Sequence, residues 1–425
     1  MSLAVIGLIV ALSVIGVPIG YALIGAVLFA LLAGGGTTPA VIPLQLFSGA
    51  AKFPLLAIPL FVLAGGLMNS SGISLRIINL ASAFVGHVRG GLAMVNVVDS
   101  MFFAEISGSA VADVAALGSI IIPAMVKKGY TPQFTAALTS VTASIAIIIP
   151  PSIPMILYAV MAETSVTRLF LAGFAPGVIG GGLLMAVVYY KARKYNFPVE
   201  EAFSLRRFGR AFREAGWTLV LPVIILGGMF GGIVTATEAA GLAVLGAFII
   251  GTFIYREMNF PQLWKVTLEG VISTASVMLI VAASGVLGWY LTNEQVPQHF
   301  AAWVLGLTTN RYLVLLFLNF FLLVAGMFLH SAAAILLIVP IVMPLVRQVG
   351  IDPTHFGIIV TLNLAIGQQT PPVASVLLTA CAVAKQPVGK VFREAIPFII
   401  CLLITLVIVT YVPAIPLFLP RLLQP

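Results

Sequence analysis

A short polar stretch in an otherwise apolar chain carries residue types that could bind a small ion. It reads Glu105-Ile106-Ser107-Gly108-Ser109, and apolar sequence flanks it from Met94 to Phe103 and from Val114 to Val126. Hydroxyl groups and backbone carbonyls are oxygen ligands that suit Na⁺, and glycine permits the non-helical backbone that exposes them. We therefore interpret the stretch as the lining of a site for something small and charged.

The apolar arms on either side predict a helical hairpin over about 91–128. Each arm is too short to cross about 30 Å of hydrocarbon, which takes roughly 20 helical residues. The simplest arrangement enters the membrane and leaves it on the same side. Non-helical backbone at membrane depth survives only where protein or water surrounds it, so the tip would line a cavity. A plain loop between two ordinary short helices is the alternative interpretation.

The same design recurs 221 residues later in the chain. Pro150-Pro151 and Pro371-Pro372 are separated by this offset. Proline and glycine restrict backbone geometry, so their agreement without gaps is hard to obtain by chance. The sequence therefore predicts two repeats, each a hairpin, a short link, a helix broken by proline and a further helix. The other matching pairs are Pro123 with Pro344, Gly129 with Gly350, Pro132 with Pro353, and Pro176 with Pro397.

The composition predicts an all-α polytopic membrane protein. Hydrophobic residues make up 61% of the chain and charged residues only 8%, whereas a soluble domain carries about a quarter charged residues. The net charge of +8 does not indicate a nucleic-acid partner, because the basic residues fall in short loops between apolar segments. There they report orientation in the bilayer.

The basic stretch at 191–216 divides the chain, and the positive-inside rule places it in the cytoplasm. An odd number of predicted crossings separates the two hairpins, so the repeats have opposite orientation and form an inverted pair. The predicted units are residues 1–190 with a hairpin at about 91–128 and a broken helix at 132–161, the linker at 191–216, and residues 217–425 with a hairpin at about 313–348 and a broken helix at 351–384.

Other segments give more local expectations. Residues 73–88 and 294–309 alternate between apolar and polar and predict amphipathic helices at the membrane interface. Residues 34–52 are expected to be a connector, and the crossing at 266–292 to be loosened at Ser284-Gly285. Gly227 and Gly228 are followed four residues later by further glycines, a spacing that allows close helix contact.

In each half the hairpin tip is expected to face the broken helix. Broken ends expose carbonyls that suit Na⁺ and amides that suit a carboxylate. Small hydroxyls often bond back to their own helix, which is the alternative for each serine and threonine. The candidate sodium ligands are Ser107, Gly108, Ser109, Ile149, Ser152, Ser331, Gly367, Gln369 and Thr370. The candidate substrate ligands are Ser109, Ser152, His330, Gln368 and Gln369. No other metal and no cofactor is expected.

Carboxylates in apolar sequence are further candidates, for ion or proton coupling, because they are costly there. Thr235 to Glu238 also matches a capping box at a helix start, and Glu269 lies near a predicted interface. The chain has no zinc-protease, nucleophile-elbow or phosphate-loop motif, so nothing favours an enzyme or ATP use. The acidic candidates are Asp99, Glu105, Asp113, Glu238 and Glu269.

Several motifs together resemble the large membrane subunit of TRAP transporters (tripartite ATP-independent periplasmic transporters, DctM-like), over nearly the whole chain. They are Ile106-Ser107-Gly108-Ser109, Ile121-Ile122-Pro123 running into Lys128-Gly129-Tyr130, Ile149-Pro150-Pro151-Ser152-Ile153-Pro154, Thr235-Ala236-Thr237-Glu238-Ala239-Ala240, Gly350-Ile351-Asp352-Pro353 with His355-Phe356-Gly357, and Thr370-Pro371-Pro372-Val373.

The resemblance implies a secondary transporter of a bacterial inner membrane, with Na⁺ coupling and an elevator motion. It also implies a small membrane subunit of four spans and a periplasmic protein that delivers an organic acid. Two departures leave the substrate class open: residues 143–149 lack the glycine expected before the first Pro-Pro, and Ala374 stands where glycine usually follows. The alternatives are a stand-alone ion-coupled anion symporter of similar design and, more distantly, a channel or structural subunit.

Overall fold

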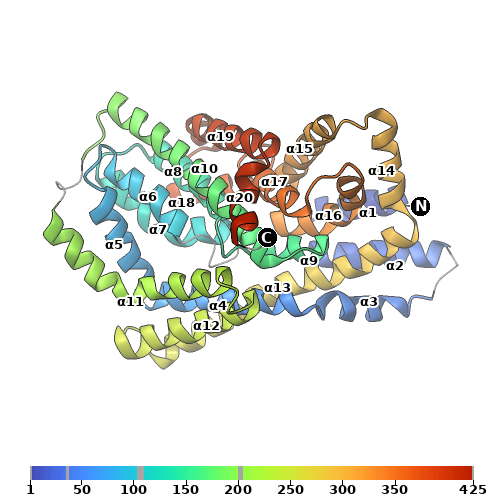
Figure 1. Ribbon diagram of the computed structural model, residues 1–425, viewed down its shortest axis with the longest axis horizontal. Helices are drawn as coiled ribbons and strands as arrows, with labels where there is room; N and C mark the ends of the chain where they lie inside the picture. The colour runs from blue at the N-terminus through green and yellow to red at the C-terminus, as the bar shows by residue number, and fades with distance from the viewer. Residues whose placement is uncertain (1, 35–37, 103–109, 200–203, 424–425) are drawn as a thin grey trace.

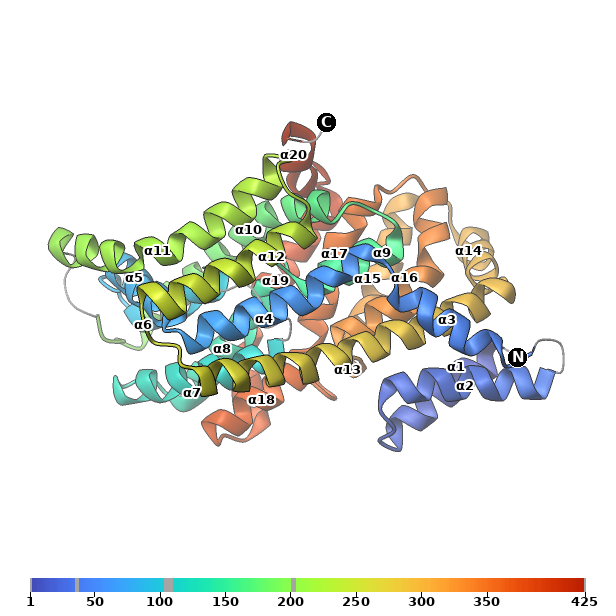
Figure 2. The same cartoon turned by 90° about the horizontal axis from the view of Figure 1, so that it is seen from below.

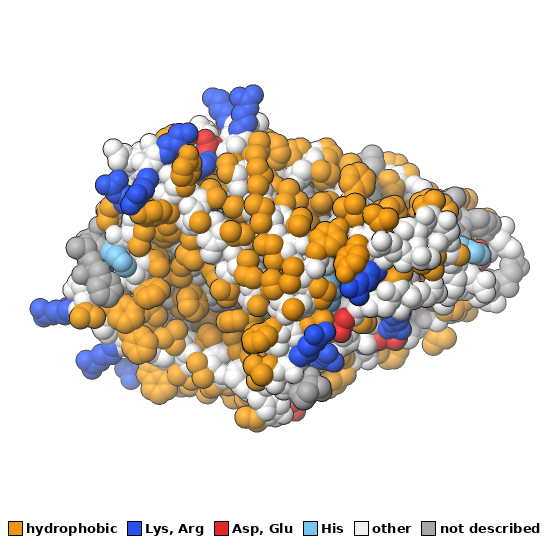
Figure 3. Space-filling model, turned by 45° about the horizontal axis from the view of Figure 1, so that its top comes forward, with side chains coloured by type: hydrophobic (Ala, Val, Ile, Leu, Met, Phe, Trp, Pro, Cys, Tyr) orange, Lys and Arg blue, Asp and Glu red, His pale blue; other side chains and the backbone are white. Residues whose placement is uncertain are grey.

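The computed structural model describes residues 2–34, 38–102, 110–199 and 204–423, and these residues form helices without any β-strand. Within these ranges, nine helices are long and apolar enough to cross a membrane. Hydrophobic side chains cover much of the face shown in Figure 3, and large ones such as Trp217, Phe253 and Trp264 are exposed. A lipid-facing surface explains this exposure, so the all-α polytopic membrane fold predicted from the sequence is confirmed.

The first half begins with two short helices separated at Gly16-Val17-Pro18. The elements are α1 (Ser2–Val14), α2 (Ile19–Gly34), α3 (Val41–Ala50), the 3₁₀ turn η1 (Phe53–Leu56), α4 (Ala57–Ser70), α5 (Ile73–Val85), α6 (Gly91–Phe102), α7 (Ala110–Lys127), α8 (Pro132–Ala146), α9 (Ile153–Ala162) and α10 (Val166–Lys194).

The second half starts at a serine cap, where Ser204 accepts a hydrogen bond from the Arg207 amide. The elements are α11 (Leu205–Phe230), α12 (Ala236–Ile249), the π-helical turn η2 (Ile250–Ile254), α13 (Phe260–Asn293), α14 (Val296–Leu307), α15 (Arg311–Phe328), α16 (Ser331–Gln348), α17 (Pro353–Gly367), α18 (Ser375–Ala384), α19 (Val388–Tyr411) and α20 (Ala414–Leu423).

The helix bounds reproduce the repeat at the offset of 221 residues. α7 corresponds to α16 and α8 to α17, with both ends of each pair matching residue for residue. Each broken helix resumes after its Pro-Pro pair as a short helix, α9 or α18, because adjacent prolines remove backbone donors. One difference between the halves lies near Pro54, which separates α3 from α4. Ala275 occupies the equivalent position in the second half, and α13 continues through it for 34 residues.

Three local expectations were wrong. Residues 34–52 are not only a connector, because they contain α3, which packs against α13. α13 is not loosened at Ser284-Gly285; a Cβ on Gly49 would lie 3.1 Å from the Gly285 Cα, so these glycines permit a close crossing of α3 and α13. The glycine spacing in α11 forms no helix face, because the helix ends at Phe230, before the second glycine of each pair.

The second arm of the first hairpin, α7, is longer than the predicted arm, whereas the two arms of the second hairpin match the predicted range of about 313–348. α7, α15 and α16 each contain 18 residues. Helical structure continues through Pro123 in α7 and through Pro340 and Pro344 in α16. Helices also extend into the basic stretch at 191–216, since α10 ends at Lys194 and α11 begins at Leu205.

Two layers and two connecting helices make up the molecule. The long helices α2, α3, α4, α11, α12 and α13 pack side by side along one side, and we call them the scaffold layer (Figures 1 and 2). Helices α6 to α10 and α15 to α19 lie above them in Figure 1 and form the inner body. The amphipathic helices α5 and α14 each contact both parts, α5 through α11 and α6, and α14 through α13 and α16.

Candidate functional site

Gln369 joins the two broken helices at the centre of the inner body. It follows the end of α17 and is fully buried. Its Nε2 donates to the Ser140 carbonyl at 2.8 Å and to Ser144 Oγ at 2.7 Å, and its Oε1 accepts from Ser140 Oγ. Both serines belong to α8, so the break of the second half is bonded to the broken helix of the first. These bonds occupy the amide of a side chain that the sequence proposed as a ligand.

The neighbouring Gln368 is less well satisfied. Its side chain is buried, and its Nε2 donates to the Leu364 carbonyl at 3.3 Å. Its Oε1 has no hydrogen-bond partner among the residues that the structure describes. Buried polar atoms are normally bonded, because an unmade hydrogen bond costs free energy. Gln368 Oε1 is therefore an oxygen free to accept a cation or a substrate donor beside the second break.

The second hairpin and the second broken helix meet at two glycines. A Cβ on Gly367 would lie 2.5 Å from the carbonyl carbon of Gly326, so only glycine allows α15 and α17 to approach this closely. The turn between α15 and α16 follows shortly after, with His330 exposed at the N-cap position and Ser331 buried. The structure thus brings α15 of this hairpin against the end of α17 at the break.

Local bonding accounts for two of the proposed hydroxyl ligands. Thr370 Oγ1 donates to the carbonyl of Ile366 in the last turn of α17 at 3.1 Å. This local back-bond is the alternative interpretation given above for hydroxyl side chains. Ser152 is buried and caps α9 by accepting a hydrogen bond from the Met155 amide at 3.5 Å. Both hydroxyl oxygens keep acceptor capacity, because a hydroxyl has two lone pairs.

The remaining candidates belong to the first half. Ser107, Gly108 and Ser109 lie outside the residues that the structure describes. Ile149 directly precedes the first Pro-Pro pair, and its side chain packs on α10, where a Cβ on Gly177 would overlap it. The described neighbourhood therefore places the first break against α10, and the proposed ligands of the first hairpin tip stay a prediction.

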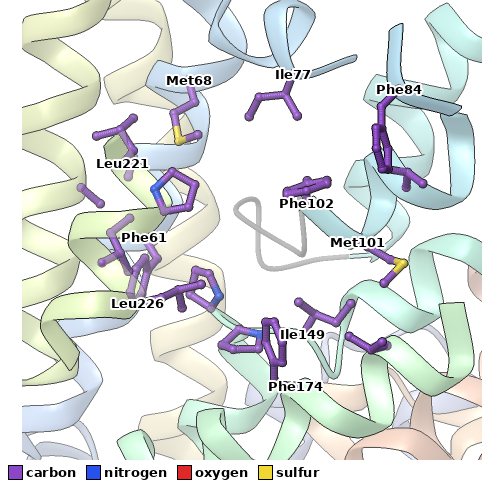
Figure 4. Close-up of a pocket in the computed structure, with 18 of the residues that line it drawn as sticks. Phe61, Met68, Ile77, Phe84, Met101, Phe102, Ile149, Phe174, Leu221 and Leu226 are labelled. Carbon is purple, nitrogen blue, oxygen red and sulfur yellow. The ribbon is translucent and has the colours of Figure 1, made fainter. Parts of the chain in front are cut away.

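The first break opens onto a chamber of about 470 Å³ between the scaffold layer and the inner body. Figure 4 shows its labelled side chains converging from both parts: Phe61 and Leu221 from the scaffold layer, and Phe102 and Phe174 from the inner body. Pro150 and Pro151 also line it, and every lining residue in the described ranges is apolar. An anion entering this chamber would therefore obtain its polar contacts at the breaks and hairpin ends.

Buried asparagines that the sequence reasoning missed tie each hairpin to its broken helix. Asn96 of α6 donates to Thr139 of α8 at 2.8 Å. In the second half, Asn363 of α17 donates to the Asn319 side chain of α15 at 2.6 Å, and Asn319 donates to Thr410 of α19 at 3.2 Å. The sequence did contain a signal for these contacts, because an asparagine in an apolar helix needs a hydrogen-bond partner.

Several charged residues around the site form ion pairs or cap helices. Lys191 of α10 bonds Glu394 of α19 at 2.5 Å, and Arg76 of α5 bonds Glu257 at 2.6 Å, which raises the pKa of the Arg76 guanidinium. Glu238 forms the predicted capping box with Thr235, so this carboxylate has a structural role. Glu269 is exposed near Lys265, and Glu105 lies outside the described residues. Within the described ranges, no group of three metal-binding side chains occurs.

Comparison with known proteins agrees with this architecture. The family described as "Tripartite ATP-independent periplasmic transporter, DctM component" matches residues 6–415. Among solved structures, the crystal structure of the Alcanivorax borkumensis YdaH transporter superposes with a TM-score of 0.63, covering 86% of each chain at 14% identity. At that identity the likeness concerns the fold, and it supports the helical transporter architecture.

Relatives of similar sequence are transporter permeases. The isethionate TRAP transporter permease protein DctMQ of Oleidesulfovibrio alaskensis is 41% identical over 95% of this chain, which spans 64% of that relative's length. The C4-dicarboxylate TRAP transporter large permease protein DctM of Pseudomonas aeruginosa is 43% identical over 89% of this chain and 88% of its own. With the broken helices, hairpins and inverted repeats described above, these matches show that the chain belongs to the DctM component family of the tripartite ATP-independent periplasmic transporters.

Proposed function

We propose that this chain is the large membrane subunit of a Na⁺-coupled importer of an organic acid anion in a bacterial inner membrane. The substrate class is a carboxylate, a dicarboxylate or a sugar acid. The observation that carries the proposal is the joint at Gln369, where two broken helices meet inside a body separated from the scaffold layer by a chamber. Broken helices at such a joint direct amides toward an anion and carbonyls toward a cation.

Sodium ions suit oxygen ligands, and a broken helix exposes backbone carbonyl oxygens at its free end. Gln368 Oε1 is a buried acceptor without a partner in the described ranges. Gly367, which precedes it, and Ser331 are the further ligands that we propose in this half. In the first half, Ser107, Gly108, Ser109, Ile149 and Ser152 are the proposed counterparts. Bound Na⁺ would supply positive charge near an anion, and no lysine or arginine lines the chamber among the described residues.

Transport would proceed by an elevator motion of the inner body against the scaffold layer. Helices α5 and α14 each contact both parts and have the position of connecting arms. α5 is anchored at one end, where Arg76 bonds Glu257 and lies over the Tyr255 ring at 3.7 Å. The breaks, the hairpin ends and the side of the chamber formed by the inner body would then move together.

Two protein partners are part of the proposal: a small membrane subunit of four spans and a periplasmic binding protein that delivers the substrate. The DctMQ relative is longer than this chain, which fits a large and a small subunit joined in one polypeptide. The scaffold layer offers an apolar lateral surface, including Trp264, Val271 and Ile272 of α13. The basic stretch at 191–216 would face the cytoplasm, as the positive-inside rule requires.

Reconstituted uptake tests the proposal. The chain is placed in liposomes with a candidate small subunit, and a candidate binding protein is added outside with radiolabelled organic acids. We expect uptake that requires both an inward Na⁺ gradient and the binding protein. Uptake without the binding protein would support the stand-alone symporter instead. Uptake driven equally well by a K⁺ gradient would contradict Na⁺ coupling.

A further inference from the structure

Asp99 is a buried acidic residue of α6, inside the inner body. The residue is 0% exposed, and neither carboxyl oxygen has a hydrogen-bond partner in the part of the chain that the structure describes. An ionised carboxylate in that position would lack both water and a donor, which is strongly unfavourable. The group must therefore be neutral, or a cation must balance its charge.

A small polar cavity adjoins this part of α6. It is bounded by α6, α7 and α8 and has a volume of about 10 Å³, room for roughly one water-sized species. Asn96, Ser100, Asp113 and Thr139 supply its polar lining. Asn96 and Ser100 stand three residues before and one residue after Asp99, so the cavity lies along the same segment of α6. A small ion in this cavity would lie against the residues that flank Asp99 on α6.

The helices that pack on α6 bring no cation to Asp99 within the described ranges. α8 has no titratable side chain, and Arg76 of α5 is bonded to Glu257. The charged group that acts on Asp99 is Asp113, in the first turn of α7, and it has the same sign, so it cannot balance a charge on Asp99. The other charged or titratable residues of these helices stand toward their ends: His87 and Arg89 before α6, Lys127 on α7, and Arg168, Tyr189, Tyr190, Lys191, Arg193 and Lys194 on α10.

We propose that Asp99 carries a proton in the folded protein and exchanges it for one monovalent cation that enters the neighbouring cavity. The exchange conserves charge, because the departing proton leaves one negative charge and the entering Na⁺ restores neutrality. The proton on Asp99 is argued from its burial and from the lack of a described partner for either carboxyl oxygen. The identity of the exchanging ion rests on the Na⁺ coupling of the proposed function.

Proton release tests the exchange directly. The purified protein in detergent is held in weak buffer with a pH-sensitive dye, and NaCl or choline chloride is added. We expect Na⁺ to release protons from the wild type, choline to release none, and Asp99→Asn to lose the release. Asp352→Asn is the matched control, because Asp352 caps α17 and asparagine caps equally well, so its release should equal that of wild type. Equal release from Asp99→Asn and wild type, or none from wild type, would overturn the exchange.

Infrared spectroscopy tests the proton without requiring transport or a variant that folds. Aspartate labelled with ¹³C at its carboxyl group is incorporated into the wild type, and the carbonyl stretch of a protonated acid is recorded at neutral pH. We expect a band that shifts with the label and that disappears in Asp99→Asn. The absence of any label-sensitive band overturns the proposal even if the variant does not fold. A band in a protein that fails the uptake test would leave Asp99 protonated and the proposed transport function refuted.

Discussion

Ser144 Oγ donates a hydrogen bond to the carbonyl oxygen of Ala365, 3.1 Å away, across the contact between α8 and α17. The two residues are 221 positions apart, the offset that relates the two repeats. A residue contacts its own repeat mate only near the axis that relates the halves, so this axis passes between these two helices. Gln369 bonds Ser144 at the same place, and both Pro-Pro breaks therefore lie about one centre.

The joint at Gln369 should contribute strongly to stability. Gln369→Leu removes its bonds to Ser140 and Ser144 and leaves buried polar atoms unpaired, at about 1–3 kcal/mol for each such atom. We expect a clear fall in the thermal unfolding temperature of the purified protein. Gln386→Leu is the control, because Gln386 bonds Gln133 where both are only partly buried, and its effect should be much smaller. Equal unfolding temperatures for both variants would show that the joint is not a stabilising element.

The glycine contact between the second hairpin and the second break should tolerate no side chain. Gly367→Ala would place a methyl group against Gly326 and force α15 away from α17, a packing error that costs about 1–3 kcal/mol. We expect lower thermal stability and weaker Na⁺ dependence of uptake. Gly389→Ala, which has no atom within 4 Å of the new carbon, is the control and should behave as wild type. A Gly367→Ala variant with normal stability would mean that the contact opens freely.

Ion binding at the second break should depend on the buried oxygen of Gln368. Gln368→Leu keeps the size of the side chain and removes this acceptor, so the Na⁺ concentration for half-maximal uptake should rise about tenfold, the equivalent of ~1.4 kcal/mol. Ser109→Ala and Thr370→Val should also weaken Na⁺ dependence more than they weaken assembly. A Na⁺ titration of reconstituted uptake decides each case. A variant with an unchanged titration curve removes its position from the ion sites.

The anchor of α5 should affect the rate of transport more than the stability of the fold. Arg76→Ala breaks a partly exposed ion pair, which contributes only about 0.2–1 kcal/mol, but it releases the arm from Glu257. We expect uptake to slow several-fold with little change in unfolding temperature. Lys265→Ala, which loses an exposed 3.9 Å pair on α13, is the control. Unchanged uptake in Arg76→Ala would show that the contact of α5 with Glu257 is not needed for transport.

Movement of the inner body should change which side of the membrane reaches the hairpins. Single cysteines are introduced as Ala110→Cys and Ala332→Cys after Cys381 and Cys401 are replaced by alanine. Both alanines are buried at the starts of α7 and α16. We expect a membrane-impermeant thiol reagent to label each cysteine from both faces, in a ratio that substrate and Na⁺ alter. Labelling from a single face under all conditions would contradict the elevator motion.

Much of the fold could be predicted from the sequence because its strongest signals are local. Proline pairs interrupt helices wherever they occur, so Pro150-Pro151 and Pro371-Pro372 fixed the two breaks. Apolar composition defined the membrane class, and the offset of 221 residues defined the repeat. The amphipathic α5 and α14 and the capping box at Glu238 were likewise predicted from spacing and are observed.

The arrangement of the candidate site was decided by tertiary packing. Gln369 bonds Ser140, 229 residues away, and Asn96, Asn319 and Asn363 find their partners on other helices. In helices that are apolar on all sides, hydrophobic periodicity does not show which face turns inward, so such pairs cannot be read from spacing. The sequence determined where the helices break and which polar residues must be satisfied. The packing of α8 against α17 decided that Gln369 is bonded within the protein. Gln368 and Asp99 keep oxygens without a hydrogen-bond partner among the described residues.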